Sequence, residues 1–345
     1  MHRTQSVVLV FLVGLLSACG GAASAQPGST GPSSWLGGAM GQQRLAVGQY
    51  GQTHIGVWVD PPNVAPPVDR GPMALSLVID TSGSMAGDKI QNARFAAASL
   101  IESLQDGDLV SVVTFSNHAT EWISPTIVGG ATRAMLMNRV QTLQAQGGTN
   151  MYGGLTLGEQ HLQRAAHSHA VRRLVMISDG HANQGPSDPY SLGQVAAQGS
   201  EFGVQVTAIG VGLGYNEHIL SELAVQSSGR LYHLAHPAQM ASILEQELQM
   251  MRQVIATNAW IDIVPGPGVR ILGIESLGGQ MMGNRARIRL GSLLGGESKE
   301  ILLRVQVDTS RLGTHPAATA TLVYEDPAGR QSRQQNAVLH YEIVN

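Results

Sequence analysis

Side chains able to hold a hard metal cation gather where a buried strand is predicted to end. Asp80, Ser82 and Ser84 form a D-x-S-x-S pattern after the apolar run 75–79, and Gly83 lets the chain turn. Carboxylate and hydroxyl oxygens suit Mg2+, Mn2+ or Ca2+ far better than zinc or copper. Taken alone, these residues fit equally well a polar turn whose Asp and Ser cap the next helix.

Two further segments favour the metal interpretation. Thr149 lies in the glycine-rich loop 147–150, directly before a helical pattern. Asp179 ends a second apolar strand, 174–178. Open α/β sheets bind ligands outside the carboxyl ends of their strands, so these segments are expected at one edge. The order of the segments is more specific than any one of them.

This constellation resembles the metal-ion-dependent adhesion site of the von Willebrand factor type A family, over residues 72–255. The resemblance implies that the hydroxyls of Ser82, Ser84 and Thr149 ligate the cation, Thr149 in the ligand-competent state. Asp80 and Asp179 would then act largely through water. It also implies an open coordination position for a carboxylate from a protein partner.

The elements that must position these residues alternate between strands and helices. Such alternation predicts an α/β fold with a doubly wound, mostly parallel, Rossmann-like sheet, and the family resemblance adds an antiparallel edge strand at 120–128. Helices are expected at 90–104, 132–143, 151–166, 189–199, 216–224 and 238–255, and further strands at 109–115 and 202–211.

The pattern of the sequence changes at Thr257. Short alternating or apolar runs separated by Gly, Pro, Asp or Asn predict a small β-sandwich over 257–345. The isolated strand 53–59 needs a sheet to join, so residues 42–71, with a Pro-rich linker at 61–71, are expected to pack on this sandwich. The von Willebrand factor type A domain is placed at 72–256.

The N-terminus has the pattern of an export signal. Arg3 precedes the apolar run 6–16, which is too short to span a bilayer. Residues 16–19, Leu-Ser-Ala-Cys, resemble a bacterial lipobox, which implies a signal peptide at 1–19 and a lipid on Cys19, the only cysteine. Gly20 after it favours the outer membrane. The alternative is cleavage after Ala25, which leaves a soluble periplasmic or secreted protein. Residues 20–41 are expected to be a flexible tether.

Other functions have weaker support. A net charge of −3 gives no electrostatic case for nucleic acid. His161, His167 and His169 have spacings that do not place three rings on one helix face, and we expect them to be solvated.

The sequence thus predicts an adhesion or scaffold protein, tethered to the cell envelope, that binds a protein partner through Mg2+, or through Mn2+ or Ca2+. No general base or separate nucleophile accompanies the pattern, so we expect no enzyme. Two alternatives stay open: a metal-dependent hydrolase, and a structural lipoprotein whose metal only stabilises loops.

Overall fold

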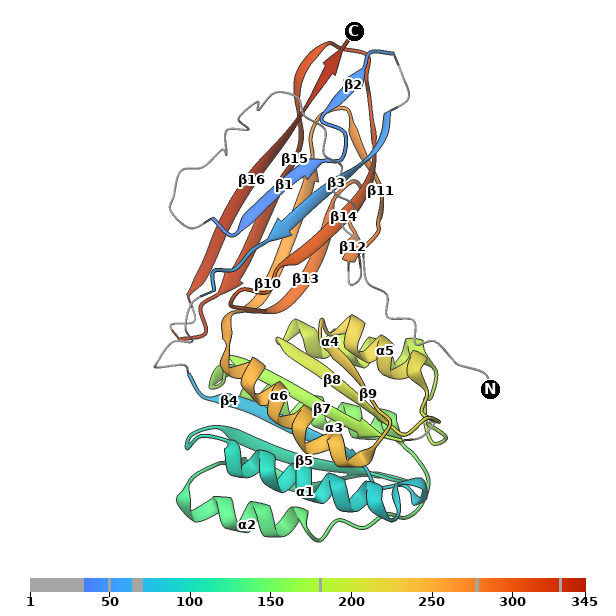
Figure 1. Ribbon diagram of the computed structural model, residues 1–345, viewed down its shortest axis with the longest axis vertical. Helices are drawn as coiled ribbons and strands as arrows, with labels where there is room; N and C mark the ends of the chain where they lie inside the picture. The colour runs from blue at the N-terminus through green and yellow to red at the C-terminus, as the bar shows by residue number, and fades with distance from the viewer. Residues whose placement is uncertain (1–33, 49–50, 64–70, 180–181, 277–278, 329–330) are drawn as a thin grey trace, which may run out of the picture.

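The computed structural model describes residues 34–48, 51–63, 71–179, 182–276, 279–328 and 331–345 (Figure 1). Within them, an α/β layer and a β-sandwich stack along the long axis of the molecule. The predicted signal peptide with Cys19, most of the predicted tether, and Gly180 lie outside the described residues.

The α/β layer is built on a six-stranded sheet. Every residue of its central strands is buried, because helices cover both faces, which explains their continuous apolar sequences. All neighbouring strands are parallel except the edge strand β6, which runs antiparallel to β5 as expected. In spatial order the strands are β6 (Ala119–Ile127), β5 (Leu109–Phe115), β4 (Met73–Asp80), β7 (Val171–Ser178), β8 (Val204–Val211) and β9 (Arg230–Leu234).

Helices lie on both faces of this sheet. Leu77 of β4 faces one apolar cluster and Val78 the other, as the alternation of a strand requires. The doubly wound α/β fold predicted from the sequence is therefore confirmed. The Leu77 face is covered by α1 (Asp88–Ser103), α2 (Gly130–Val140) and α6 (Met240–Arg252); the Val78 face by α3 (Met151–Arg164), α4 (Pro189–Glu201) and α5 (Glu217–Gln226).

The remaining strands form the expected additional β-sandwich. One sheet is four-stranded, in the order β1 (Leu36–Met40), β3 (Gly51–Val59), β14 (Lys299–Val307) and β11 (Val269–Ile274). The other is six-stranded, in the order β12 (Gly279–Met281), β13 (Ala286–Leu294), β10 (Val254–Pro265), β15 (Gly313–Glu325), β16 (Ser332–Val344) and β2 (Arg44–Ala46). A single apolar core lies between the sheets.

The N-terminal strand β3 joins the sandwich, pairing antiparallel with β14 from Gly51 to Val59. This is the partner region expected for it, while the predicted domain boundaries and folding units stay predictions. The predicted flexible tether is wrong from Leu36 onward, because β1 pairs with β3 and buries Leu36 and Met40. Gly37 of β1 allows close packing against β3, because a Cβ on Gly37 would come within 2.2 Å of the Trp58 indole nitrogen.

Several boundaries differ from the sequence-based expectation. The last helix ends at Arg252 instead of residue 255, because Val254 already pairs with Leu294 in the sandwich. The edge strand β9 was not predicted, since its residues 230–233 are not fully buried and lack a clear period. Strand β16 begins at residue 332, well before the predicted start at 338, because its polar outer half is exposed.

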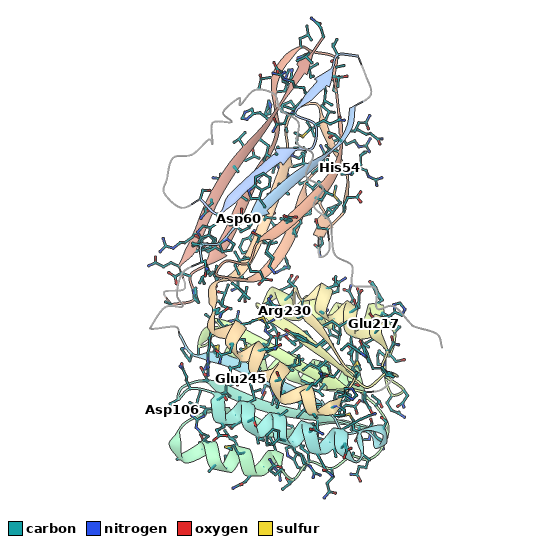
Figure 2. The ribbon with its side chains drawn as sticks, in the orientation of Figure 1. His54, Asp60, Asp106, Glu217, Arg230 and Glu245 are labelled. Carbon is teal, nitrogen blue, oxygen red and sulfur yellow. The ribbon has the colours of Figure 1, made fainter. Side chains whose placement is uncertain are left out.

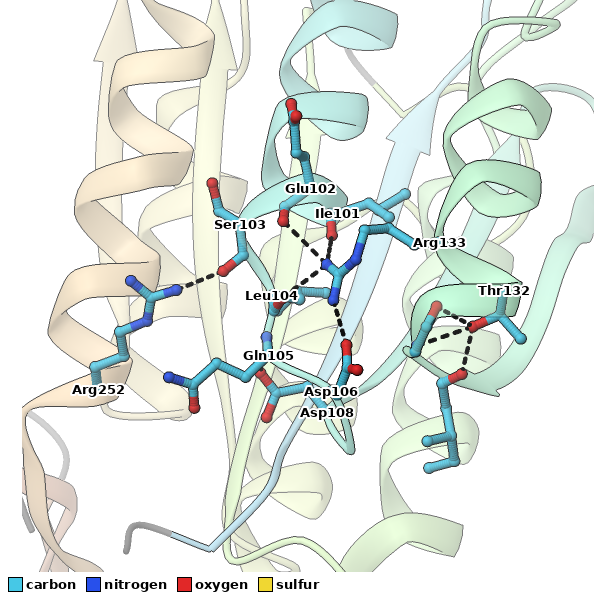
Figure 3. A network of polar contacts seen from close by, with 12 residues as sticks. Ile101, Glu102, Ser103, Leu104, Gln105, Asp106, Asp108, Thr132, Arg133 and Arg252 are labelled. Carbon is cyan, nitrogen blue, oxygen red and sulfur yellow. Dashed lines mark hydrogen bonds and ion pairs between the residues drawn. The ribbon is translucent and has the colours of Figure 1, made fainter. Parts of the chain in front are cut away.

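Arginine side chains fix the end of α1 that lies away from the polar loop (Figure 3). Arg133 from α2 donates to the carbonyls of Ile101 (2.8 Å), Glu102 (2.9 Å) and Leu104 (2.7 Å), and Arg252 from α6 donates to Ser103. The last carbonyls of a helix have no partner within the helix, so these contacts satisfy groups that would otherwise need water.

The two layers meet through polar contacts between close backbones. Gly291 of β13 has a φ of +70°, and a Cβ there would lie 2.2 Å from Nε2 of Gln205. Gly203 has a φ of +71°, and a Cβ there would lie 2.0 Å from Oδ1 of Asn258. Glycine tolerates both the positive φ and the close approach. Beside them Arg230 pairs with Glu297 at 3.0 Å, and Figure 2 shows Arg230 facing the sandwich.

Candidate metal centre

The carboxyl ends of β4 and β7 meet at one edge of the parallel sheet and bring two acidic residues together. Asp80 ends β4 and is fully buried. Its Oδ1 accepts from the Ser82 amide at 2.8 Å and its Oδ2 from the Ser178 hydroxyl at 2.6 Å. Burial raises the pKa of Asp80, while the hydrogen bonds from Ser178 and Ser82 act in the opposite direction. Both carboxylate oxygens are thus held in a fixed orientation.

A chain of short contacts links the serine loop to Asp179. The Ser82 and Ser84 hydroxyl oxygens lie 3.0 Å apart, and Ser84 donates to Oδ1 of Asp179 at 2.7 Å. Ser82 is 2 % exposed and Asp179 6 % exposed, whereas Ser84 is open to solvent. The residues predicted from the D-x-S-x-S pattern and from the second strand therefore form one cluster with an accessible side.

Thr149 is joined to this cluster through its loop. Gly83 donates to the Gly147 carbonyl at 3.0 Å, and Gln146 donates to the Thr81 carbonyl at 2.6 Å. Thr149 is 3 % exposed and follows Gly147, whose φ of +82° turns the chain toward the start of α3. The structure thus places the loop that carries Thr149 beside the serine loop, with backbone bonds between the two loops.

Further residues of this cluster were not identified from the sequence. Lys89, near the start of α1, pairs with Oδ2 of Asp179 and donates to the Ser84 carbonyl at 3.2 Å. Ser178 supports Asp80, and Asn183 accepts from the Thr149 amide at 2.9 Å. The usable signals were the position of Ser178 directly before Asp179 and the presence of one lysine within six residues of Ser84.

The donor set fits a hard divalent cation. Two carboxylates and neighbouring hydroxyls converge, and a single ammonium group, that of Lys89, offsets their charge. In the described part of the chain no three His, Cys, Asp or Glu side chains form a metal-binding group. A cation at this edge would therefore depend on the hydroxyls, which disfavours soft metals.

The expectation of solvated histidines is wrong for two of the three. His161 is 1 % exposed, with its Nε2 2.7 Å from a carboxylate oxygen of Glu121. Burial lowers the pKa of His161. His169 is also buried, with its Nδ1 2.8 Å from the Ser168 hydroxyl. His161 lies on the face of α3 that packs against the edge strand, which the spacing of the three residues did not indicate.

Within the described residues, no helix is both long enough and apolar enough to cross a membrane.

The chain was also compared with known proteins. Residues 75–246 match the model of the von Willebrand factor type A domain. The chain is 28 % identical to the uncharacterized protein sll0103 of Synechocystis over 274 residues, which are 76 % of this chain and 64 % of that protein. It is 26 % identical to the uncharacterized protein YfbK of Escherichia coli, over 56 % of this chain and 34 % of that one. The chain thus spans less than two thirds of either relative.

Solved structures share the whole two-layer arrangement. A von Willebrand factor type A protein from Catenulispora acidiphila superposes with a TM-score of 0.76 at 19 % identity, over 92 % of this chain and 76 % of that one. The ArnB paralog VWA2 from Sulfolobus acidocaldarius superposes with a TM-score of 0.63 at 18 % identity, over 90 % and 75 %. At these identities the likeness concerns the fold alone.

Proposed function

Because residues 75–246 are a von Willebrand factor type A domain, which places the chain in that family, we propose that it binds a protein partner through a divalent cation. The cation is Mg2+, with Mn2+ and Ca2+ as alternatives. Ser82, Ser84 and Thr149 are its direct protein ligands, and Asp80 and Asp179 support it. The observation that carries this proposal is the hydrogen-bonded chain Ser82–Ser84–Asp179 at the edge of the sheet.

The division of roles follows from burial and contacts. Asp80 is held at both oxygens, so it fixes the serine loop and adds negative charge from behind. Ser84 is on the exposed side, so a carboxylate of the partner can approach there. When bound, the cation supplies the positive charge that attracts this carboxylate. The surrounding loops would then determine which acidic partner is accepted.

We propose a binding role and no catalysis. In the described part of the chain, the side-chain contacts of Ser82 and Ser84 are with each other and with Asp179, which leaves neither hydroxyl beside a histidine base. Activated serine nucleophiles need such a base within hydrogen-bonding reach. A hydrolase that uses the same cation is the less favoured alternative.

The place of action proposed from the sequence is the bacterial cell envelope. A lipid on Cys19 would hold the protein at a membrane, preferably the outer membrane, as an adhesion or assembly scaffold. The competing proposal is a soluble periplasmic or secreted protein, cleaved after Ala25. Strand β1 begins at Leu36, so a tether from Cys19 would be shorter than the predicted range 20–41.

Calorimetric titration with Mg2+, Mn2+ and Ca2+ tests the metal directly. The double variant Ser82→Ala/Ser84→Ala loses direct ligands and is expected to give no binding heat. Asp80→Asn is expected to bind about 10- to 100-fold more weakly, the usual cost of losing a supporting group. Ser221→Ala, a serine on α5 remote from the site, is the control and should bind like wild type. Binding by the double variant at wild-type affinity would reject the ligand assignment.

Capture of partners from envelope extract separates an adhesive metal from a structural one. Wild type should retain partners in Mg2+ and release them in EDTA, and the double serine variant should retain none in either buffer. If wild type binds the metal but captures the same proteins with and without it, the cation only stabilises the loops.

A further inference from the structure

Among the described residues, strand β16 has one edge in the sandwich along which most of its length has no paired strand. On one side it pairs with β15 from Ser332 to Ile343. On the other side β2 pairs only with residues 342–344. Among the described residues no strand pairs with 332–341 on that second side. A long stretch of backbone N–H and C=O groups therefore faces outward there.

The residues that present these groups follow from the bonds to β2. The Glu342 amide donates to Gln43 at 2.8 Å, and the Val344 carbonyl accepts from Val47 at 2.8 Å. Backbone groups alternate in direction along a strand, so the even-numbered residues point the same way. Pro316 of β15 supports this assignment. It lacks a backbone N–H and lies opposite His340, whose backbone groups point away from β15, so no hydrogen bond from residue 316 is needed there. Ser332, Gln334, Asn336, Val338 and His340 thus carry the backbone groups that have no strand partner within the described part of the chain.

The residues of this edge have none of the side chains that usually prevent another strand from pairing. The side chains of the same five residues are all exposed, and none is proline, lysine, arginine or acidic. Val338 is 52 % exposed. Three other edge strands are protected in the usual ways: β12 has three residues and β1 five, while β6 contains Pro125 and carries Glu121. Natural proteins seldom leave a long, neutral strand edge unless something pairs with it.

We propose that this edge binds the same edge of a second copy of the chain, as an antiparallel pair with its two-fold axis at Asn336. The free stretch ends at β2 on one side and at the start of β16 on the other, and Asn336 is its midpoint. Antiparallel pairing about this residue uses the whole stretch and keeps β2 of each copy clear of the partner strand. A two-fold interface requires such self-complementarity.

The side chains are compatible with this register. Asn336 would lie opposite Asn336 of the second copy, Gln334 opposite Val338, and Ser332 opposite His340. No pair sets like-charged acidic or basic groups against each other, which would oppose pairing. Each of these residues would exchange its N–H and C=O bonds with one residue of the other copy. The interface is independent of the metal site, which lies in the other layer.

Sedimentation of the full chain at several concentrations, in a mild detergent because residues 6–16 are apolar, tests the proposal. Wild type should show a monomer–dimer equilibrium. Val338→Lys sets a lysine beside Gln334 and close to the two-fold axis, and should weaken dimerisation at least about tenfold. Thr319→Lys is the matched control: Thr319 is the exposed neighbour of Val338 on β15, but its strand has partners on both sides. It should dimerise like wild type.

Hydrogen exchange identifies the occupant of the edge. In the dimer the amides of 334, 336, 338 and 340 should exchange more slowly as concentration rises, with no such change in Val338→Lys. Protection that is independent of concentration and lost when residues 1–33 are deleted would show that the chain covers its own edge, which overturns the proposal. A monomer at all concentrations with unprotected amides overturns it as well.

Discussion

One buried carboxyl group, that of Glu159 on α3, has no compensating partner in the part of the chain that the structure describes. Glu159 is 2 % exposed, and neither of its carboxyl oxygens has a hydrogen-bond partner among the described residues. Burial raises its pKa from 4.5 to about 9. The side chain occupies space over Gly199 of α4, where a Cβ would lie 1.4 Å from Oε2. The protonated acid is therefore the form that the folded protein accommodates at neutral pH.

This raised pKa predicts that stability falls as pH increases. Below about pH 4.5 the group is protonated in both the folded and unfolded chain, so it brings no penalty. Between pH 4.5 and about 9 only the unfolded chain ionises, which lowers the free energy of unfolding by about 1.4 kcal/mol per pH unit. Glu159→Gln removes the titration, so its stability relative to wild type should increase steadily from pH 5 to pH 8.

Urea unfolding at several pH values measures this difference. Glu245→Gln, which changes an exposed acid on α6, is the control and should follow wild type at every pH. Parallel pH curves for Glu159→Gln and wild type would contradict the expectation.

The elements show what can be predicted from sequence. The strands β4, β7 and β8 are buried along their whole length, so continuous apolar runs identified their cores. The ends of β4 and β7 gave Asp80, Ser82, Ser84 and Asp179, and the glycine-rich loop before α3 gave Thr149. β9 and β1 were missed because partial burial and glycine leave no clear period. Lys89 and Ser178 were missed because their role comes from contacts between separate strands and loops, which spacing along the chain does not encode.

The place of β3 in the sandwich gives a prediction at this scale. Ile55 is fully buried and lies between Met40 of β1 and Leu303 of β14. Ile55→Ala should lower the free energy of unfolding by about 2–5 kcal/mol, through lost burial and a residual cavity. If β3 folds with the sandwich, hydrogen exchange should accelerate at β14 and stay unchanged at β4.

His54→Ala is the control for Ile55→Ala, because the neighbouring His54 is exposed and should tolerate the change (Figure 2). Equal acceleration at β14 and β4 would show that the two layers unfold as one unit. Acceleration confined to β3 would show that this strand is peripheral to the sandwich.

At the scale of the whole molecule, Gly291 and Gly203 allow close contact between the α/β layer and the sandwich. These contacts predict that the two layers keep a fixed orientation relative to each other. Gly291→Ala imposes both a strained positive φ and a clash with Gln205, so it should loosen or displace the contact between layers. Gly283→Ala is the matched control, because Gly283 has a similar φ of +66° but open space around it. The control should lose about 1–2 kcal/mol of stability and keep its shape.

Small-angle X-ray scattering checks this orientation. The radius of gyration should increase for Gly291→Ala and match wild type for Gly283→Ala. Replacing Gln205 with alanine in the Gly291→Ala background removes the clash and should restore the wild-type value. An unchanged radius in Gly291→Ala would mean that other contacts fix the two layers.

The insertion of the α/β layer between β3 and β10 in the chain has a mechanical consequence. β3 ends at Val59 before this layer and β10 begins at Val254 after it, and the two strands belong to different sheets of the sandwich. Each is an interior strand with neighbours on both sides; β3 runs toward the α/β layer, and β10 runs away from it (Figure 1). Tension applied at the end of the α/β layer that lies far from the sandwich would therefore be divided between the two sheets of the sandwich. The force would act along the strands and would shear many inter-strand hydrogen bonds at the same time.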